Sequence, residues 1–284
     1  MGAGTFDASD ERSGSRLLVH ASAPAADGTI VSVSPQAAGW SHVGFEVLLL
    51  GPGLVATRDT ASREVCVVVI SGSIDISSAH AKWRGIGHRA SPFDGPPDAA
   101  YLPPRTRFEL AGAGEVALCY APAAAGAAGA RLLPAGAVEA ERRGRGSYER
   151  TVRPILMGDL AADSLLVCEV LTPAGNWSSY PPHKHDRDAP PGESLLEEIY
   201  YHRLEPPQGF AVQRVYSPER GLDATLTAGD RDTVLIPYGY HTVAAAPEYD
   251  LYYLNVMAGP RRAWLISNDP DHDWLAAPAA GREA

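Results

Sequence analysis

Lysine is nearly absent from this chain of 284 residues, which has only Lys82 and Lys184. Arginine supplies the remaining basic residues, and 24 bases face 34 acids for a formal net charge of −10. A protein that binds the phosphate backbone needs a basic surface. The charge balance therefore argues against a nucleic-acid partner.

Cysteine is also scarce, with three widely spaced residues, Cys66, Cys119 and Cys168. An odd set without a CxxC pair favours buried free thiols over a disulfide framework. No apolar run approaches the ~20 residues of a membrane-spanning helix, and the polar residues 1–14 lack the apolar core of a signal peptide. We therefore expect a cytoplasmic protein that does not contact a membrane.

Long amphipathic helices are missing as well. Short runs of β-branched and aromatic residues recur instead between Gly, Pro, Asp and Ser, a pattern typical of strands. They include EVCVVVI, SLLVCEVL, EEIYYHRL and YDLYYLNVM. Their number and spacing predict an all-β protein built from sandwiches or barrels rather than βαβ units.

A shift in composition divides the chain, with Ala, Gly and Pro over 121–140 and a basic stretch, ERRGRGSYERTVR, over 141–153. We interpret 141–153 as a solvated linker with a charged face, and an anion or partner site as its alternative. The flanking halves share a faint strand–turn pattern, which predicts a duplicated β-barrel. We expect one barrel over 1–140 and a second over 154–284.

The second half contains histidines in a pattern suited to a metal. His183 and His185 are two positions apart, and such residues share one face of a strand about 6.6 Å apart. Both imidazoles can therefore bind one ion. A carboxylate at the start of EEIYYH could add an oxygen ligand, and PYGYH places His241 just after a turn. Mixed nitrogen and oxygen ligands suit one divalent ion of Zn, Mn, Fe, Co or Ni.

This order of HxH, Glu before an aromatic strand, and PxGxxH resembles the two motifs of the cupin superfamily. In that superfamily three His and one Glu bind a divalent metal inside a small β-barrel. The resemblance implies that His183, His185, Glu198 and His241 are the ligands. Twelve residues separate the second His from the Glu, whereas the superfamily usually has three or four.

Glu197 is an alternative to Glu198 as the carboxylate ligand. We prefer Glu198 because the superfamily's Glu directly precedes the hydrophobic strand residues, as Glu198 does here. Alternation along a strand also places Glu198, Tyr200 and His202 on one face.

Longer motifs between about residues 39 and 274 closely resemble the 5-deoxyglucuronate isomerase family of inositol catabolism. They include SSYPPHKHDRDAPPGESLLEEIYYHRL, QGFAVQRVY and YDLYYLNVMAGPRRAW. The resemblance implies a bicupin, with two cupin-type barrels, that converts 5-deoxy-D-glucuronate, a small anionic sugar acid, to 2-deoxy-5-keto-D-gluconate. The first half has neither HxH nor PxGxxH. We therefore expect it to have lost its metal, and to cover the second barrel or form the interface of a homo-oligomer.

Aldose–ketose isomerisation moves two hydrogens between adjacent carbons, either through an enediol or by a metal-assisted hydride shift. A base with a pKa near neutrality is needed. His202 is our first candidate for the base, and Tyr200 could donate to a substrate oxygen. For both residues, simple packing in the barrel wall is the alternative.

Substrate contacts are expected from two further strands. Gln213 and Arg214 alternate, so only one of them faces inward. An inward Arg214 would be a natural partner for the substrate carboxylate, and a surface ion pair is the alternative. Tyr253 and Asn255 share one face and could line the pocket, or they pack in the core.

Two other functions fit the same ligands. Cupins with this set include Fe(II) dioxygenases, which would consume oxygen. A non-catalytic cupin would bind a metal and a sugar acid without turnover, although no helix-turn-helix pattern supports a DNA-binding regulator.

Overall fold

The computed structural model describes residues 16–123, 128–137 and 139–276. Residues 1–14, which led us to expect no signal peptide, lie outside these ranges. Regular structure is almost entirely β, so the all-β prediction is confirmed. The described helices are short, namely α2 (Pro35–Ala38) and 3-10 turns at Pro92–Asp94, Gly146–Tyr148, Pro218–Arg220 and Asp273–Leu275. None of them has the length and apolar character that crossing a membrane requires.

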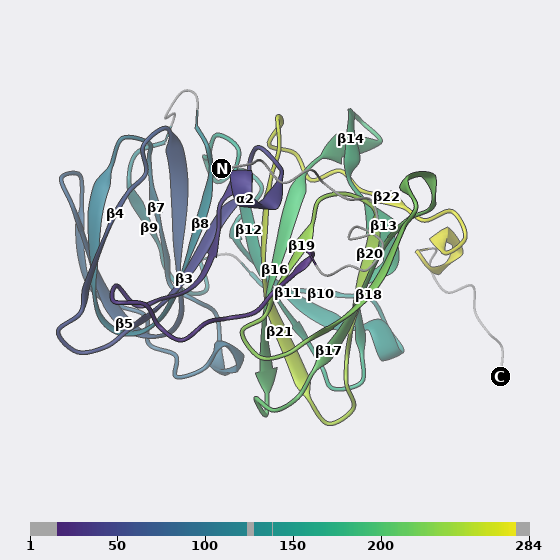
Figure 1. Ribbon diagram of the computed structural model, residues 1–284, viewed down its shortest axis with the longest axis horizontal. Coiled ribbons are helices and arrows are strands. Elements are labelled where there is room, and N and C mark those ends of the chain that lie inside the picture. The colour runs from purple at the N-terminus through teal and green to yellow at the C-terminus, as the bar shows by residue number, and fades with distance from the viewer. Residues whose placement is uncertain (1–15, 124–127, 138, 277–284) are drawn as a thin grey trace, which may run out of the picture.

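The N-terminal half is built on one antiparallel sheet of eight strands, on the left of Figure 1. Its strands are β2 (Thr29–Val33), β3 (Gly44–Leu50), β4 (Val55–Asp59), β5 (Arg63–Ser78), β6 (Lys82–Ile86), β7 (Ala99–Leu102), β8 (Arg107–Pro122) and β9 (Arg131–Leu133). The long strands β5 and β8 pair along their whole length. Side chains from both ends of β5, such as Val67 and Ile74, meet in one apolar core.

The C-terminal half contains two larger sheets and a hairpin. The seven-stranded sheet has the order β1 (Leu18–Val19), β19 (Thr233–Ile236), β16 (Glu197–Glu205), β21 (Asp250–Ala258), β12 (Leu166–Thr172), β11 (Arg150–Leu156) and β10 (Glu141–Arg143). The five-stranded sheet has the order β18 (Leu222–Ala228), β17 (Ala211–Ser217), β20 (Tyr240–Ala245), β13 (Trp177–Lys184) and β22 (Ser267–Asn268). The hairpin pairs β14 (Asp186–Ala189) with β15 (Glu193–Leu195).

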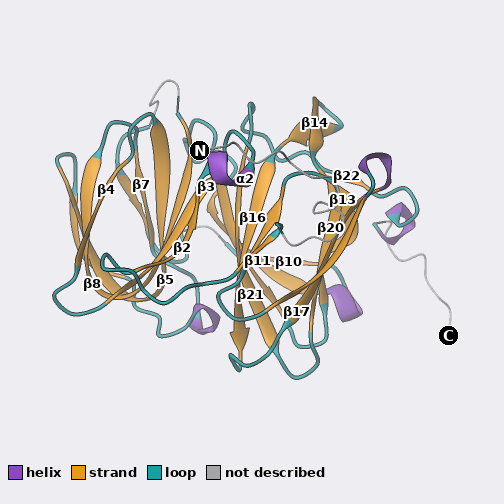
Figure 2. Ribbon diagram, in the orientation of Figure 1, coloured by secondary structure: helices purple, strands orange, loops and turns teal. Residues whose placement is uncertain are grey.

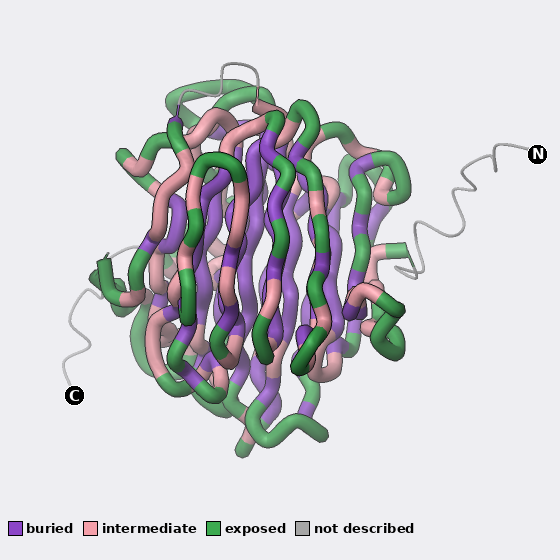
Figure 3. The backbone as a smooth tube through the Cα atoms, turned by 90° about the vertical axis from the view of Figure 1, so that its left-hand side faces the viewer, coloured by how far each residue is buried: buried purple, intermediate pink, exposed green. Residues whose placement is uncertain are grey.

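The seven-stranded sheet is buried on both faces. Ile199 and Tyr201 of β16 pack into a core shared with the N-terminal half. Tyr200 and Tyr253 point the other way, into the core between the two C-terminal sheets. A strand buried on both faces needs apolar residues at nearly every position, which explains the runs EEIYYHRL and DLYYLNVM. Figure 3 shows buried stretches along the strands of the interior, and exposed residues in the turns and along the strands nearest the viewer.

Two carboxylates join the halves in matching ways. Glu197 of β16 accepts hydrogen bonds from the backbone N–H groups of residues 41–43, just before β3, at 2.7, 2.7 and 2.9 Å. Glu64 of β5 accepts them from residues 163–165, just before β12, at 2.8, 2.7 and 2.7 Å. Each half thus holds the other through equivalent positions, as an internal duplication would produce.

The segment 141–153 is not the solvated linker that its composition predicts. Its two ends form β10 and the start of β11 in the seven-stranded sheet. β10 is the edge strand of that sheet, and edge strands often carry charged side chains that block further pairing. The charged side chains of this edge strand therefore give the segment the same composition as a solvated linker. The expected domain boundary at residue 140 is also crossed, because β1, which precedes it, pairs with β19 of the C-terminal half.

Candidate metal centre

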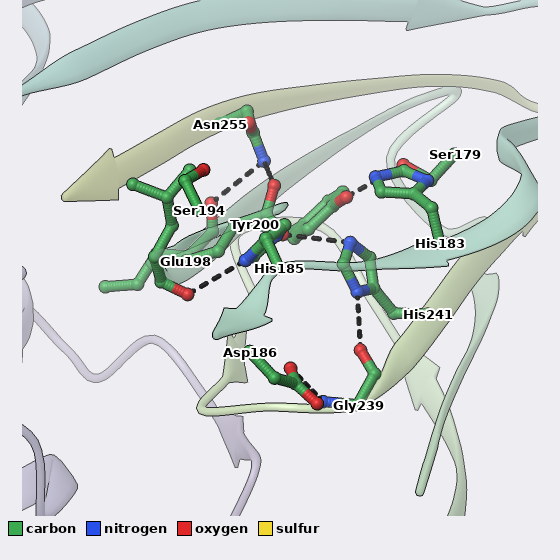
Figure 4. A network of polar contacts seen from close by, with 12 residues as sticks. Ser179, His183, His185, Asp186, Ser194, Glu198, Tyr200, Gly239, His241 and Asn255 are labelled. Atoms are coloured by element: carbon green, nitrogen blue, oxygen red, sulfur yellow. Dashed lines mark hydrogen bonds and ion pairs between the residues drawn. The ribbon is translucent and has the colours of Figure 1, made fainter. Parts of the chain in front are cut away.

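Two histidines and one glutamate meet between the two C-terminal sheets (Figure 4). His185 follows β13, Glu198 lies on β16 and His241 on β20, and all three are buried. One ligand atom from each lies within 4.8 Å of the others. The Nε2 atoms of both histidines lie 2.9 Å from the same oxygen of Glu198, Oε2. This convergence of nitrogen and oxygen donors suits a divalent ion.

Backbone and side-chain contacts orient the three residues. Leu196 O lies 2.9 Å from Nδ1 of His185, and Gly239 O lies 3.1 Å from Nδ1 of His241. Each contact fixes the ring so that Nε2 faces the centre, as in known metal sites. Asn255 donates from Nδ2 to Oε1 of Glu198 at 2.6 Å. Nε2 of His241 is buried and makes no hydrogen bond of good geometry, as expected of an atom reserved for a metal.

The PxGxxH turn sets the position of His241. Gly239 has φ of +96°, and a Cβ there would lie 2.7 Å from the backbone oxygen of Tyr216. Only glycine fits such a position without strain. The Gly239 N–H also donates to Oδ1 of Asp186 at 2.9 Å, which ties the turn to the strand end that carries His185.

The long spacing between His185 and Glu198 is taken up by a hairpin. β14 and β15 leave the site and return to it, so Glu198 regains the position that a shorter connection would give it. Lys184 faces away from the centre, as alternation predicts. It is buried, and its Nζ pairs with Glu193 at 3.0 Å.

Alternation along β16 separates the two candidate carboxylates. Glu198 faces the histidines, whereas Glu197 points into the N-terminal half and holds residues 41–43. Tyr200 and His202 share the face of Glu198, as expected, and their stacked ring centroids lie 6.2 Å apart.

His183 lies beside the three-residue cluster. Its ring centroid is 4.7 Å from that of His241 and 6.3 Å from that of His185. Burial, together with the neighbouring His241, holds the pKa of His183 well below its usual range. Burial alone would raise the pKa of Glu198, but His241 and His185 hold it well below the usual range. A neutral imidazole and an ionised carboxylate are the forms that bind metals.

A cavity of about 40 Å³ adjoins the cluster. Its lining includes His183, Glu198, Tyr200, Tyr253 and Asn255, so the predicted pocket residues Tyr253 and Asn255 do reach it. The hydroxyl of Tyr200 hydrogen-bonds with Ser179 at 2.8 Å, and that of Tyr253 with Ser178 at 2.7 Å. Burial raises the pKa of Tyr200 well above its usual range, so this hydroxyl stays protonated.

Other predicted residues do not reach the cavity. His202 is fully buried but does not contribute to the lining. Burial lowers its pKa to about 4, which is too low for the base near neutrality that we expected. Alternation along β17 turns Gln213 inward and Arg214 outward, where Arg214 pairs with Asp223 at 2.9 Å. The expected contact of Arg214 with a substrate carboxylate is therefore wrong.

Seven lining residues were not predicted, and those with polar or aromatic side chains are Arg143, Arg150, Ser179 and Trp264. The arginines belong to the basic stretch 141–153, for which an anion site was the less favoured interpretation. If 141–153 is interpreted as two paired strands rather than as a linker, its arginines are predicted to lie beside the site.

Comparisons with known proteins agree with this geometry. The chain matches the KduI/IolB family over residues 17–275. It is 48% identical over 264 residues to the 5-deoxy-glucuronate isomerase of Geobacillus kaustophilus HTA426, covering 92% of this chain and 95% of the relative. A solved IolB-like protein from Salmonella typhimurium LT2 is 42% identical with a TM-score of 0.88, covering 92% of this chain and 99% of that one. Oxalate decarboxylase of Lactobacillus farciminis shares the fold, with a TM-score of 0.60 at 13% identity over 92% of this chain and 90% of that one.

Proposed function

The chain belongs to the KduI/IolB family, and we propose that it is an aldose–ketose isomerase that converts 5-deoxy-D-glucuronate to 2-deoxy-5-keto-D-gluconate in myo-inositol catabolism. A curated relative with the name 5-deoxy-glucuronate isomerase is 48% identical, and the similarity covers 95% of its length. The observation that carries the chemistry is the buried convergence of two imidazoles on the carboxylate of Glu198.

His183, His185, Glu198 and His241 would hold one divalent ion of Zn, Mn, Fe, Co or Ni. The donor set fits, because the Nδ1 atoms of His185 and His241 contact backbone oxygens and their Nε2 atoms face inward. When bound, the ion polarises the substrate carbonyl and stabilises the negative charge that develops on its oxygen.

The neighbouring residues position the substrate and supply a hydrogen-bond donor. Tyr200 keeps its hydroxyl proton, and Ser179 holds that hydroxyl in the cavity, so Tyr200 can donate a hydrogen bond to the substrate oxygen on which negative charge develops. Asn255 keeps Glu198 aligned through its hydrogen bond. Tyr253 packs against Tyr200 with ring centroids 4.7 Å apart, which fixes the ring of Tyr200.

The test is an isomerase assay on 5-deoxy-D-glucuronate with metal-stripped protein and with protein reloaded with each ion. We expect turnover only after reloading, without oxygen uptake. His241→Ala should lose both bound metal and turnover, whereas His80→Ala, at an exposed histidine of the N-terminal half, should lose neither.

Oxygen consumption with Fe(II) would instead indicate a dioxygenase. Binding of the sugar acid without turnover under any ion would indicate a non-catalytic cupin. Full activity of His241→Ala would refute the ligand set.

A further inference from the structure

The proposed substrate is an anion, and the protein that would bind it carries a net charge of −10. The site itself contains a further acidic residue, Glu198. A substrate carboxylate therefore needs local positive charge beside the cavity. Arg214 cannot provide it from the outer face, and Lys184 is committed to Glu193.

Arg150 is a guanidinium without a carboxylate partner among the described residues. Arg89 pairs with Glu169 at 3.0 Å and Arg203 with Glu115 at 2.9 Å, whereas Arg262 donates only to backbone oxygens and lies away from the cavity. Arg150 donates from Nη1 to the backbone oxygens of Tyr148 and Tyr180, both at 3.2 Å. These bonds fix its position but leave its charge uncompensated.

Arg143 places a second positive charge at the same point. It lies directly opposite Arg150 in the β10–β11 pair, and like charges facing each other across a ladder are destabilising. Arg143 also pairs with Glu141 at 2.6 Å and stacks over the ring of Trp264 at 4.8 Å. An anion held between the two guanidinium groups would relieve their repulsion.

Both arginines line the cavity that Glu198 and Tyr200 also line. We propose that Arg150, assisted by Arg143, binds the carboxylate of the substrate and turns its carbonyl end toward Glu198. This inference rests on the proposed function and adds a determinant of specificity, because a neutral aldose would leave Arg150 uncompensated. A six-carbon acid exceeds a cavity of about 40 Å³, so part of the substrate would extend past the partly exposed Arg143 and Trp264.

The test compares two substrates, 5-deoxy-D-glucuronate and the analogue whose carboxylate is reduced to a primary alcohol. Loss of a charge-assisted contact should lower kcat/KM of Arg150→Gln on the acid by about 100-fold, mainly through KM. Its kcat/KM on the alcohol should stay unchanged, so the preference for the acid collapses. Arg150→Lys keeps the charge and should recover part of the loss.

Arg142→Gln is the matched control, because Arg142 lies next to Arg143 on β10 but is exposed and pairs with Glu149. Its preference for the acid should equal that of the wild type. Metal content and Tm are measured for each variant, so that a folding or metal defect in Arg150→Gln is separated from a binding defect. A wild-type preference in a correctly folded, metal-loaded Arg150→Gln would overturn the inference while the isomerase function stands.

A calorimetric titration with the acid whose aldehyde is reduced to an alcohol needs no turnover. Its Kd should rise about 100-fold in Arg150→Gln and stay unchanged in Arg142→Gln. If the wild type isomerises neither sugar, the proposed function fails, and this titration still decides the inference. Equal Kd values in Arg150→Gln and the wild type would overturn it.

Discussion

Glu197 and Glu198 are adjacent in sequence, yet only the removal of Glu198 should abolish metal binding. In Glu197→Ala, the N–H groups of residues 41–43 lose acceptors at 2.7–2.9 Å. Hydrogen bonds to charged groups contribute roughly 1.5–3 kcal/mol each. They are not additive, and water can reach the exposed Ser41. We therefore expect the free energy of unfolding to fall by about 3–5 kcal/mol, with bound metal retained.

Glu198→Ala should lose the metal. In the metal-free protein the buried carboxylate of Glu198 contacts two imidazoles and the amide of Asn255. Removing only one member of such a buried cluster leaves the others without a partner and costs roughly 3–5 kcal/mol. The free energy of unfolding of metal-free Glu198→Ala should therefore fall about as far as that of Glu197→Ala, so bound metal is the quantity that separates the two variants.

Urea unfolding of metal-stripped proteins measures the first quantity, and elemental analysis of reloaded proteins measures the second. Glu64→Ala is the matched control, because Glu64 makes the equivalent contacts to residues 163–165 and lies outside the metal centre. It should behave like Glu197→Ala. Metal lost from Glu197→Ala, or retained by Glu198→Ala, would refute this account of β16.

Three further predictions concern the surroundings of the metal. Asn255→Ala removes the 2.6 Å contact to Glu198 and should weaken metal affinity by roughly 10–100-fold; unchanged affinity in a competition titration would exclude this orienting role. The pKa of His202 is about 4 in the folded protein and roughly 6.5 when unfolded. The stability that the neutral imidazole provides is therefore complete above pH 6.5, and the free energy of unfolding falls by up to ~3 kcal/mol as the pH drops to 4. His202→Phe should flatten that part of the stability profile and keep turnover, and loss of turnover with metal retained would restore His202 as the base. Gly239→Ala forces a Cβ to 2.7 Å from a backbone oxygen at a φ of +96°, and should displace His241 and reduce metal content; full loading by elemental analysis would contradict this.

The candidate metal ligands could be proposed from the sequence because their signals are local. His183 and His185 follow the two-residue period of a strand, and the PxGxxH turn carries its geometry in the single residue Gly239. The same period placed Glu198, Tyr200 and His202 on one face. The twelve-residue insertion did not disturb this pattern, because it forms its own hairpin and returns the chain to the start of β16.

Contacts between distant segments could not be predicted in this way. Alternation shows that Gln213 and Arg214 face opposite sides, but only the packing of β17 decides which side is the interior. The arginines over 141–153 indicate charge, whereas their position at the cavity depends on the pairing of β10 with β11 and of β11 with β12. The partners of Glu197 lie more than 150 residues away, and no local pattern predicts them.

The N-terminal half supports the metal centre although none of its described residues belongs to the cluster. β16 is buried between two cores, and a slip of one residue would exchange its two faces. Tyr201 packs into the core shared with the N-terminal half and donates to Glu115 of β8 at 2.8 Å, while Glu197 holds the chain before β3. These contacts fix the register of β16 from outside the site. Because close-packed cores do not deform continuously, the packing of Tyr201 keeps Glu198 in line with the histidines even when the contacts of Glu197 are removed.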